Sequence, residues 1–156
     1  MNRTIVLLTV LPAVVLARPT HADDAKLVKP INLSVNTAAD EDDPFVSSSG
    51  LTLWYASNAE GKFDILASER RNIRAAWGKG KLLRDWVRTE VDDRGVCATR
   101  DGIYPQYLYF ATKKDKEINN FDIYIAVKQS RQAVFSSPTP INTVDTEADE
   151  MHPSLA

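Results

Sequence analysis

The chain has 156 residues, enough for one domain with a sizeable hydrophobic core. Hydrophobic residues make up 44% and charged residues 26%, and the formal net charge of −2 argues against nucleic-acid or anionic-membrane binding, which would favour a basic face. Cys97 is the only cysteine, so no internal disulfide can form and the fold must be held by its core.

Residues 1–22 have the layout of a secretory signal peptide. Arg3 supplies a positive start, an apolar run extends from Ile5 to Ala17, and Ala22 precedes an acidic pair. A membrane anchor is the alternative, but as a helix this run spans about 20 Å, short of a ~30 Å hydrocarbon core. We therefore predict cleavage after Ala22 and a periplasmic or secreted mature chain that does not insert into the membrane.

Residues 23–34 are predicted to lead into the repeated part of the chain. The segment from Asp23 to Lys29 is polar and charged. From Pro30 to Val35 apolar side chains alternate with polar ones, which predicts a short strand, and a proline suits the start or the edge of a sheet.

One pattern occurs three times: valine, any residue, threonine, two residues and two acids. The copies start at Val35, Val87 and Val144, which are 52 and 57 residues apart. A period in this range indicates a repeat architecture. We expect a first repeat over residues 35–86, a second over residues 87–143, and the start of a third over residues 144–156.

Each full repeat contains short β-rich runs separated by turn residues. In the first repeat these runs are Phe45–Val46, Leu51–Ala56, Phe63–Ala67 and Leu82–Val91. In the second repeat, Tyr107–Thr112 corresponds to the second of these runs and Asn120–Ile125 to the third. Four strands at this period is the size of a propeller blade. A single sandwich of about eight strands also fits the length but leaves the repeated lettering unexplained. We expect an all-β fold of two four-stranded antiparallel blades plus the start of a third, in an incomplete ring.

The repeats resemble the TolB-type, WD40-like β-propeller repeats of exported bacterial proteins. The matching residues are Glu41, Pro44, Phe45, Ser47, Gly50, Leu51–Tyr55, Ser57 and Phe63–Ile65, then Asp101–Gly102, Tyr107–Thr112 and Phe121–Tyr124, then Glu150 and Pro153. The sequence departs from the family pattern where Ser48-Ser49 replaces Pro-Asp and where Val96 replaces proline. The resemblance implies a ring of about six blades. This chain is expected to be a truncated piece, so further blades or other copies would be needed to close the ring. It also implies that residues 31–35 form the outer strand that completes a last blade.

Runs of acidic residues recur at one position of every repeat. Ca²⁺ binds several oxygen atoms at once, so these runs are candidate metal ligands: Asp40, Asp42, Asp43, Asp92 and Asp93. Their recurrence favours a structural role instead, as acceptors for turn N–H groups before a strand. The preferred prediction is that the chain holds no metal and no cofactor.

The remaining reactive or aromatic residues have structural interpretations. Cys97 stands where the first repeat has Phe45, which predicts a small buried side chain, and a nucleophile would need a histidine and an orienting acid. His152, the one histidine after residue 22, is expected to be a polar turn residue. Four aromatic residues at strand spacing are expected to pack between blades rather than to stack on a ligand: Trp54, Tyr55, Tyr109 and Phe110.

The sequence therefore favours an exported, non-catalytic propeller scaffold that binds another protein or a component of the cell envelope. The alternative is a fragment of a propeller enzyme, either a serine peptidase or a sugar lyase, whose catalytic residues lie beyond Ala156. A Ca²⁺-stabilised propeller that binds carbohydrate is a third reading. No nucleic-acid partner is expected.

Overall fold

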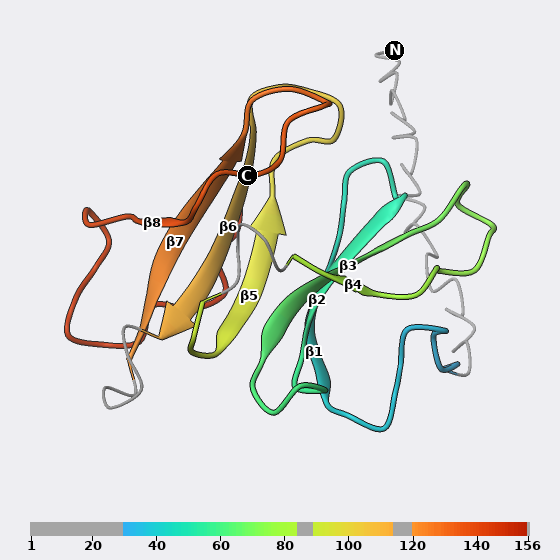
Figure 1. The fold of residues 1–156 in the computed structure, drawn as a ribbon, viewed down its shortest axis with the longest axis horizontal. Helices are drawn as coiled ribbons and strands as arrows, with labels where there is room; N and C mark the ends of the chain where they lie inside the picture. Colours follow the sequence, from blue (N-terminus) through green and yellow to red (C-terminus); the bar gives the residue numbers. More distant parts are fainter. Residues whose placement is uncertain (1–29, 84–88, 114–119, 156) are drawn as a thin grey trace, which may run out of the picture. The chain divides into compact units, whose positions relative to one another are not determined.

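The structure, a computed structural model, describes residues 30–83, 89–113 and 120–155. The chain divides into two compact units, Met1–Ile31 and Asn32–Ala156, and the sheets and sites described below belong to the second. The described residues form strands and turns but no helix, and so none that could cross a membrane (Figure 1). The predicted signal peptide falls outside the described residues.

Each repeat folds into its own four-stranded antiparallel sheet, which confirms the predicted all-β class. Sheet 1 has the order β1 (Glu41–Val46), β2 (Thr52–Ser57), β3 (Asp64–Glu69) and β4 (Lys81–Leu82). Sheet 2 has the order β5 (Asp93–Ala98), β6 (Gln106–Lys113), β7 (Phe121–Lys128) and β8 (Thr139–Pro140). The two sheets exchange no strand, since each is a meander in chain order, and they do not close a ring (Figure 1).

The first strand of each sheet has the same irregularity. The register of β1 against β2 shifts between Asp42 and Phe45, and the register of β5 against β6 shifts between Arg94 and Cys97. These are equivalent positions, 52 residues apart. The sheets therefore share a detail of backbone path as well as their strand order.

Three expectations about the strands need correction. Residues 30–35 form no strand, because the N–H of Asn36 donates to the carbonyl of Leu33 and closes a turn that brings Val35 onto sheet 1. The acidic residues from Glu41 onward lie in β1 rather than in a turn before it. The fourth strand of the first repeat covers only Lys81–Leu82 among the described residues, and not Leu82–Val91.

The largest hydrophobic cluster lies between the two sheets. Trp54 and Ile65 project from sheet 1, and Leu83 directly follows β4. They pack against Val96, Ala98, Leu108, Phe110 and Ala126 of sheet 2 and against Phe135 from the connection between β7 and β8. We call this side of sheet 1 its exit face and this side of sheet 2 its entry face. The entry face of sheet 1 carries the equivalent residues Leu53 and Tyr55, which pack with Val35, Leu66 and Trp77 in a smaller cluster.

Candidate functional site

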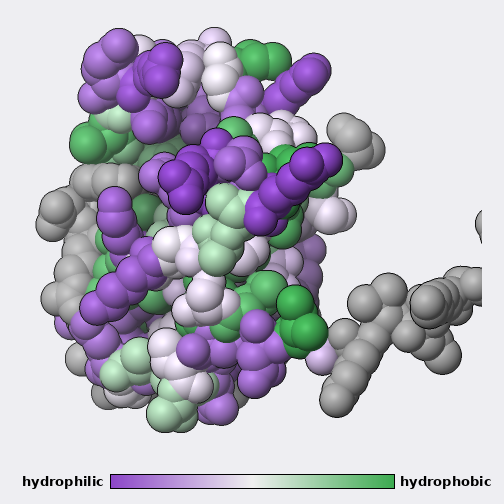
Figure 2. Space-filling model, turned by 90° about the vertical axis from the view of Figure 1, so that its right-hand side faces the viewer, coloured by the Kyte–Doolittle hydropathy of each residue, from purple (hydrophilic) through white to green (hydrophobic). Residues whose placement is uncertain are grey.

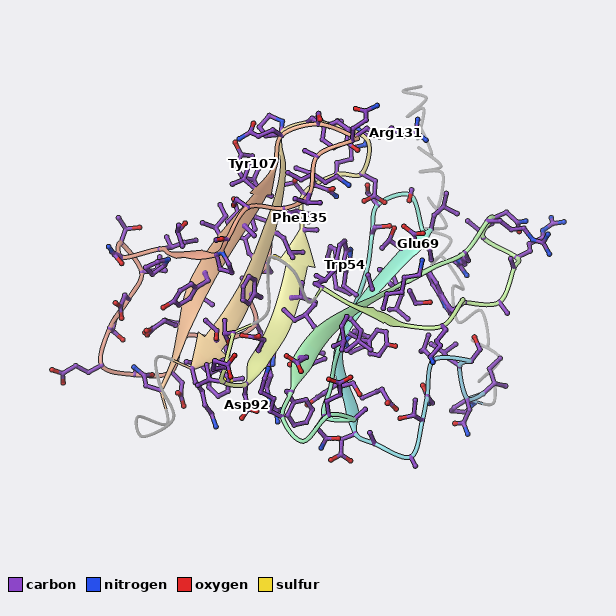
Figure 3. All side chains as sticks on the ribbon, in the orientation of Figure 1. Trp54, Glu69, Asp92, Tyr107, Arg131 and Phe135 are labelled. Carbon is purple, nitrogen blue, oxygen red and sulfur yellow. The ribbon has the colours of Figure 1, made fainter. Side chains whose placement is uncertain are left out.

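The acidic pair of the second repeat joins sheet 2 to sheet 1 through main-chain hydrogen bonds. The carboxylate of Asp92 accepts the N–H of Phe63 at 3.0 Å, and the N–H of Asp93 donates to the carbonyl of Phe63 at 2.8 Å. Lys113 forms an ion pair with Asp92 at 2.8 Å. Burial would raise the pKa of Asp92, but its bonds to Lys113 and Phe63 outweigh burial and lower it. We call this two-bond arrangement the clamp; Asp92 is labelled in Figure 3.

The same clamp occurs a second time, between sheet 2 and the start of the third repeat. The carboxylate of Asp149 accepts the N–H of Phe121 at 3.0 Å, and the N–H of Glu150 donates to the carbonyl of Phe121 at 2.7 Å. Phe121 is the equivalent of Phe63. The first acid of each pair, Asp92 or Asp149, thus accepts a main-chain N–H of the neighbouring repeat, which the sequence did not predict. The second acid accepts an N–H of its own turn, as predicted: the N–H of Thr89 donates to Asp93 at 3.2 Å.

The threonine of each repeat motif stabilises the turn that carries the acids, because its hydroxyl donates a hydrogen bond to the second acid. The hydroxyl of Thr89 donates to Asp93 at 2.9 Å, and it accepts the N–H of Val91 at 3.3 Å. The hydroxyl of Thr146 likewise donates to Glu150. In the first repeat, Thr37 donates its hydroxyl to Glu41 at 2.6 Å and its N–H to the same carboxylate at 2.9 Å.

Two of these acids have shifted pKa values for opposite reasons. Burial raises the pKa of Asp93 to about 6, although Thr112 and Thr89 donate hydrogen bonds to it. Burial would also raise the pKa of Glu41, but the hydrogen bonds from Thr37 and Ser57 outweigh burial and lower that pKa below its ordinary value. Asp93 is thus nearer to its neutral form at pH 7 than Glu41 is.

Equivalent residues of all three repeats meet at the first strands. Asp43 accepts the N–H of Gly95 at 3.0 Å, and its other carboxylate oxygen lies 3.0 Å from Nε2 of His152. All three residues have positive φ angles, of 50°, 58° and 55° respectively. Glycine is required in the middle copy, because a Cβ there would lie 2.9 Å from the backbone nitrogen of His152. The sequence placed His152 in a turn but gave no signal of its pairing with Asp43.

The predicted calcium ligands do not converge on one point. Asp40 bonds to Asn58, Asp42 to Arg94, and Asp43 to Gly95 and His152, while Asp92 and Asp93 belong to the clamp. Within the described ranges, one other group of carboxylates has oxygen atoms within 4.8 Å of one another: Asp122, Asp145 and Glu150. The second clamp itself explains this proximity, since it holds Glu150 against the strand that carries Asp122. We therefore assign no metal to the group.

Cys97 has the surroundings of a structural residue. It is buried opposite Tyr109, as Phe45 is opposite Trp54, and burial raises the pKa of its thiol. A raised pKa keeps the sulfur protonated and weakly nucleophilic at neutral pH. His152 lines the same cavity of about 420 Å³, but its Nε2 is engaged by Asp43. These observations support the structural interpretation of this cysteine.

A larger cleft of about 970 Å³ opens between the two sheets, at the end away from the clamp. Its apolar floor is formed by Trp54 and Phe135, whose rings meet edge to face with centroids 6.1 Å apart (Figure 3). Four cationic side chains line it, against the two carboxylates of Glu69 and Asp101: Lys79, Lys81, Lys128 and Arg131. The carboxylate of Asp101 already accepts hydrogen bonds from Ser49 and Gln106. The cleft is therefore a basic site in a chain of negative formal charge.

Sequence reasoning missed this cleft. Its cations come from loops and strand ends in both repeats, so no motif groups them along the chain. The aromatic residues were predicted better, because Trp54 and Phe110 do pack between the sheets. Tyr55 packs instead on the opposite side of sheet 1. Elsewhere the surface in Figure 2 is largely hydrophilic, with hydrophobic side chains in small patches.

Comparisons of the chain with models of protein families, with curated proteins and with solved structures give no match in any of the three.

Proposed function

We propose that the protein is an exported, non-catalytic scaffold built from blades of the TolB-type, WD40-like propeller class. The repeated clamp supports the blade interpretation, because it joins equivalent residues of successive repeats twice in the same way. Signal-peptide-like residues 1–22 support export. The single cysteine is buried and protonated, which supports a binding role rather than catalysis.

The cleft between the sheets is the binding site in this proposal. The observation that carries it is the combination of four cationic side chains with an aromatic floor in a space of about 970 Å³. Such a site attracts a ligand that bears carboxylates or phosphates, and Trp54 and Phe135, which are 6% and 3% exposed, give the cleft a rigid apolar base. Either an acidic segment of a partner protein or an acidic polymer of the cell envelope has this chemistry.

Calorimetric titration of the mature chain with two probes tests the proposal. One probe is a peptide of alternating glutamate and phenylalanine, and the other is polygalacturonate, so that the two arms distinguish a protein from a polysaccharide source. Binding to at least one probe is expected, with an affinity that falls as salt rises, because the attraction is electrostatic.

A pair of matched double variants locates the binding. Lys81→Ala/Arg131→Ala removes two cations from the cleft and is expected to weaken binding about tenfold at low salt. Arg71→Ala/Arg74→Ala removes the same charge from exposed positions outside the cleft and should leave the affinity unchanged. Equal losses in both variants, or no heat with either probe, would refute the assignment of the cleft.

A further inference from the structure

A second cavity lies on the entry face of sheet 1, on the other side of that sheet from the basic cleft. Its volume is about 540 Å³, and the turn that carries Val35 forms one of its walls. Val35 and Tyr55 are only 5% and 4% exposed, so the face is already covered and has no need of another protein layer. Small-molecule sites have volumes of about 300–1,000 Å³. The cavity therefore has the size for a small molecule.

One half of the cavity is apolar. Tyr55 of β2 pairs with Leu66 of β3, and Leu66 pairs with Leu82 of β4, so these three side chains form a row across one face of the sheet. All three line the cavity, and Val35 lies against the row from the turn. A ligand that enters here needs an apolar part to replace water on these side chains.

The other half of the cavity is acidic. Glu41 of β1 pairs with Ser57 of β2, and Ser57 pairs with Asp64 of β3, which forms a polar row beside the apolar one. Glu41 is ionised at neutral pH, because its pKa lies below the ordinary value. The carboxylates and ammonium groups of this half comprise Glu41, Glu60 and Asp64, the lining Lys79, and Lys62, which pairs with Asp64. Acids thus exceed cations by one, so the charge of the cavity favours a cation.

The hydroxyl of Tyr55 points to a ligand independently of this charge. It makes no hydrogen bond with any residue that the structure describes, although the side chain is 96% buried. Gly80 leaves the room for it, because a Cβ at that position would overlap the hydroxyl oxygen. Burial and then the charge of Glu41 raise the pKa of Tyr55, so the hydroxyl stays neutral and its oxygen can accept a hydrogen bond. A buried polar group without a partner costs free energy, which a ligand in the cavity would recover.

We propose that this cavity binds a small organic ammonium ion, a primary amine with an apolar body. The ammonium group donates to the carboxylate of Glu41 and to the hydroxyl oxygen of Tyr55, and the body covers Leu66 and Leu82. This site is additional to the cleft between the sheets and selects the opposite charge, since the cleft is lined mainly by cations. Neither site depends on the other, so each can fail without the other.

Calorimetric titration of the mature chain with two probes of the same shape tests the proposal. The probes are 2-phenylethylamine, which is protonated at pH 7, and 2-phenylethanol, which has the same body without the charge. We expect the amine to bind with a Kd of about 1 mM or tighter and the alcohol to bind about tenfold more weakly. Equal affinities, or no heat from the amine up to about 10 mM, would overturn the proposal.

Matched variants test the two polar contacts. Tyr55→Phe removes only the hydroxyl and should weaken amine binding about fivefold, and Glu41→Gln removes the charge and should weaken it about tenfold. Their controls, Tyr107→Phe and Glu147→Gln, make the same changes outside the cavity and should leave the affinity unchanged. Thermal unfolding shows whether each variant is folded. Unchanged affinity in both Tyr55→Phe and Glu41→Gln would refute the assignment of these contacts.

Nuclear magnetic resonance of the unaltered protein locates the amine without relying on any variant. Titration with 2-phenylethylamine should shift the backbone amide signals of Ser57, Leu66 and Gly80, which line the cavity. The signal of Gly102, which lines the cleft between the sheets, should stay in place. Shifts that centre on Gly102, or that show no preference for the cavity, would overturn the proposal.

Discussion

The two sheets share their strand order, their strand irregularity and their acidic motif, but they bury their entry faces differently. Leu108 and Phe110 of sheet 2 are completely buried by residues of sheet 1, including Trp54 and Ile65. On sheet 1, Leu53 and Tyr55 are covered by the turn that carries Val35, and a cavity remains beside them. The entry face of sheet 2 is thus buried by another sheet, whereas that of sheet 1 is buried by a turn, which leaves Leu53 and Tyr55 only 2% and 4% exposed.

This difference shows where the stability of a repeat sheet comes from. A single sheet cannot bury both of its own faces, so its hydrophobic side chains become buried only where another sheet or a chain segment covers them. The clamp adds two main-chain hydrogen bonds to that packing and fixes which edges meet. We expect substitutions at the covered face to cost more than equivalent ones at the partly covered face.

The strongest test of the comparison truncates an equivalent aromatic residue on each face. Phe110→Ala should lower the free energy of unfolding by about 4 kcal/mol, because it leaves a cavity in the cluster between the sheets. Tyr55→Ala should cost about 2 kcal/mol, since that side chain already borders a cavity. Urea unfolding followed by tryptophan fluorescence measures both. Equal losses would show that the two faces are equally packed; if Phe110→Ala does not fold, Phe110→Leu against Tyr55→Phe replaces the pair.

The next test uses Asp93, the buried acid of the clamp between the two sheets, and the dependence of stability on pH. The folded-state pKa of Asp93, about 6, lies above the ordinary value of 3.8, so folding favours the protonated form. Its contribution is complete below pH 3.8 and is lost as pH rises through 6. Between pH 4.5 and 7.5 this amounts to about 2 kcal/mol. Asp93→Asn should remove this fall from the urea-derived stability profile, and an unchanged profile would contradict the assignment.

The third test compares two acids at equivalent positions of the first and second repeats. Asp92→Ala leaves the N–H of Phe63 and the ammonium of Lys113 without their partner and should cost about 2 kcal/mol. Asp40→Ala removes an exposed carboxylate whose partner is Asn58, so we expect a loss below about 0.5 kcal/mol. Thermal unfolding at one concentration measures both. Similar losses would mean that the clamp adds nothing between the sheets.

The smallest effect separates steric from conformational cost at two glycines with positive φ. Gly95→Ala brings a Cβ within 2.9 Å of the His152 backbone, whereas Gly102→Ala meets nothing within 4 Å. Both changes carry a strain of about 1 kcal/mol, and Gly95→Ala should cost about 1 kcal/mol more. Calorimetric unfolding resolves this difference. If the two variants unfold alike, the third repeat does not pack on β5 in solution.

The sequence predicted the sheets well because the same order of strands and turns could be read in both full repeats. The strands expected at Leu51–Ala56 and Phe63–Ala67 lie within two residues of β2 and β3. The strand expected at Pro30–Val35 was wrong, since alternation alone does not reveal that a turn carries Val35 onto sheet 1. A short segment of alternating apolar and polar residues forms a strand only where a neighbouring strand is available to pair with it.

The candidate sites were harder to predict because they join residues that are distant in the chain. The acids Asp92 and Asp93 were noticed, but their partner is a main-chain group of Phe63, which carries no sequence signal. Lys81 and Arg131 line one cleft only because the two sheets stack. The motif threonine was the one visible clue, since it recurs with the acids and folds every copy of the clamp.

The clamp has a consequence for how such chains can diverge. It recognises the N–H and carbonyl of Phe63 and Phe121, groups that nearly every amino acid offers, so the identity of the held residue is free to change. Only the spacing of the threonine and the acids must be retained. Repeats of this kind can therefore diverge in amino-acid sequence, or be duplicated and lost, while successive repeats still pack against one another.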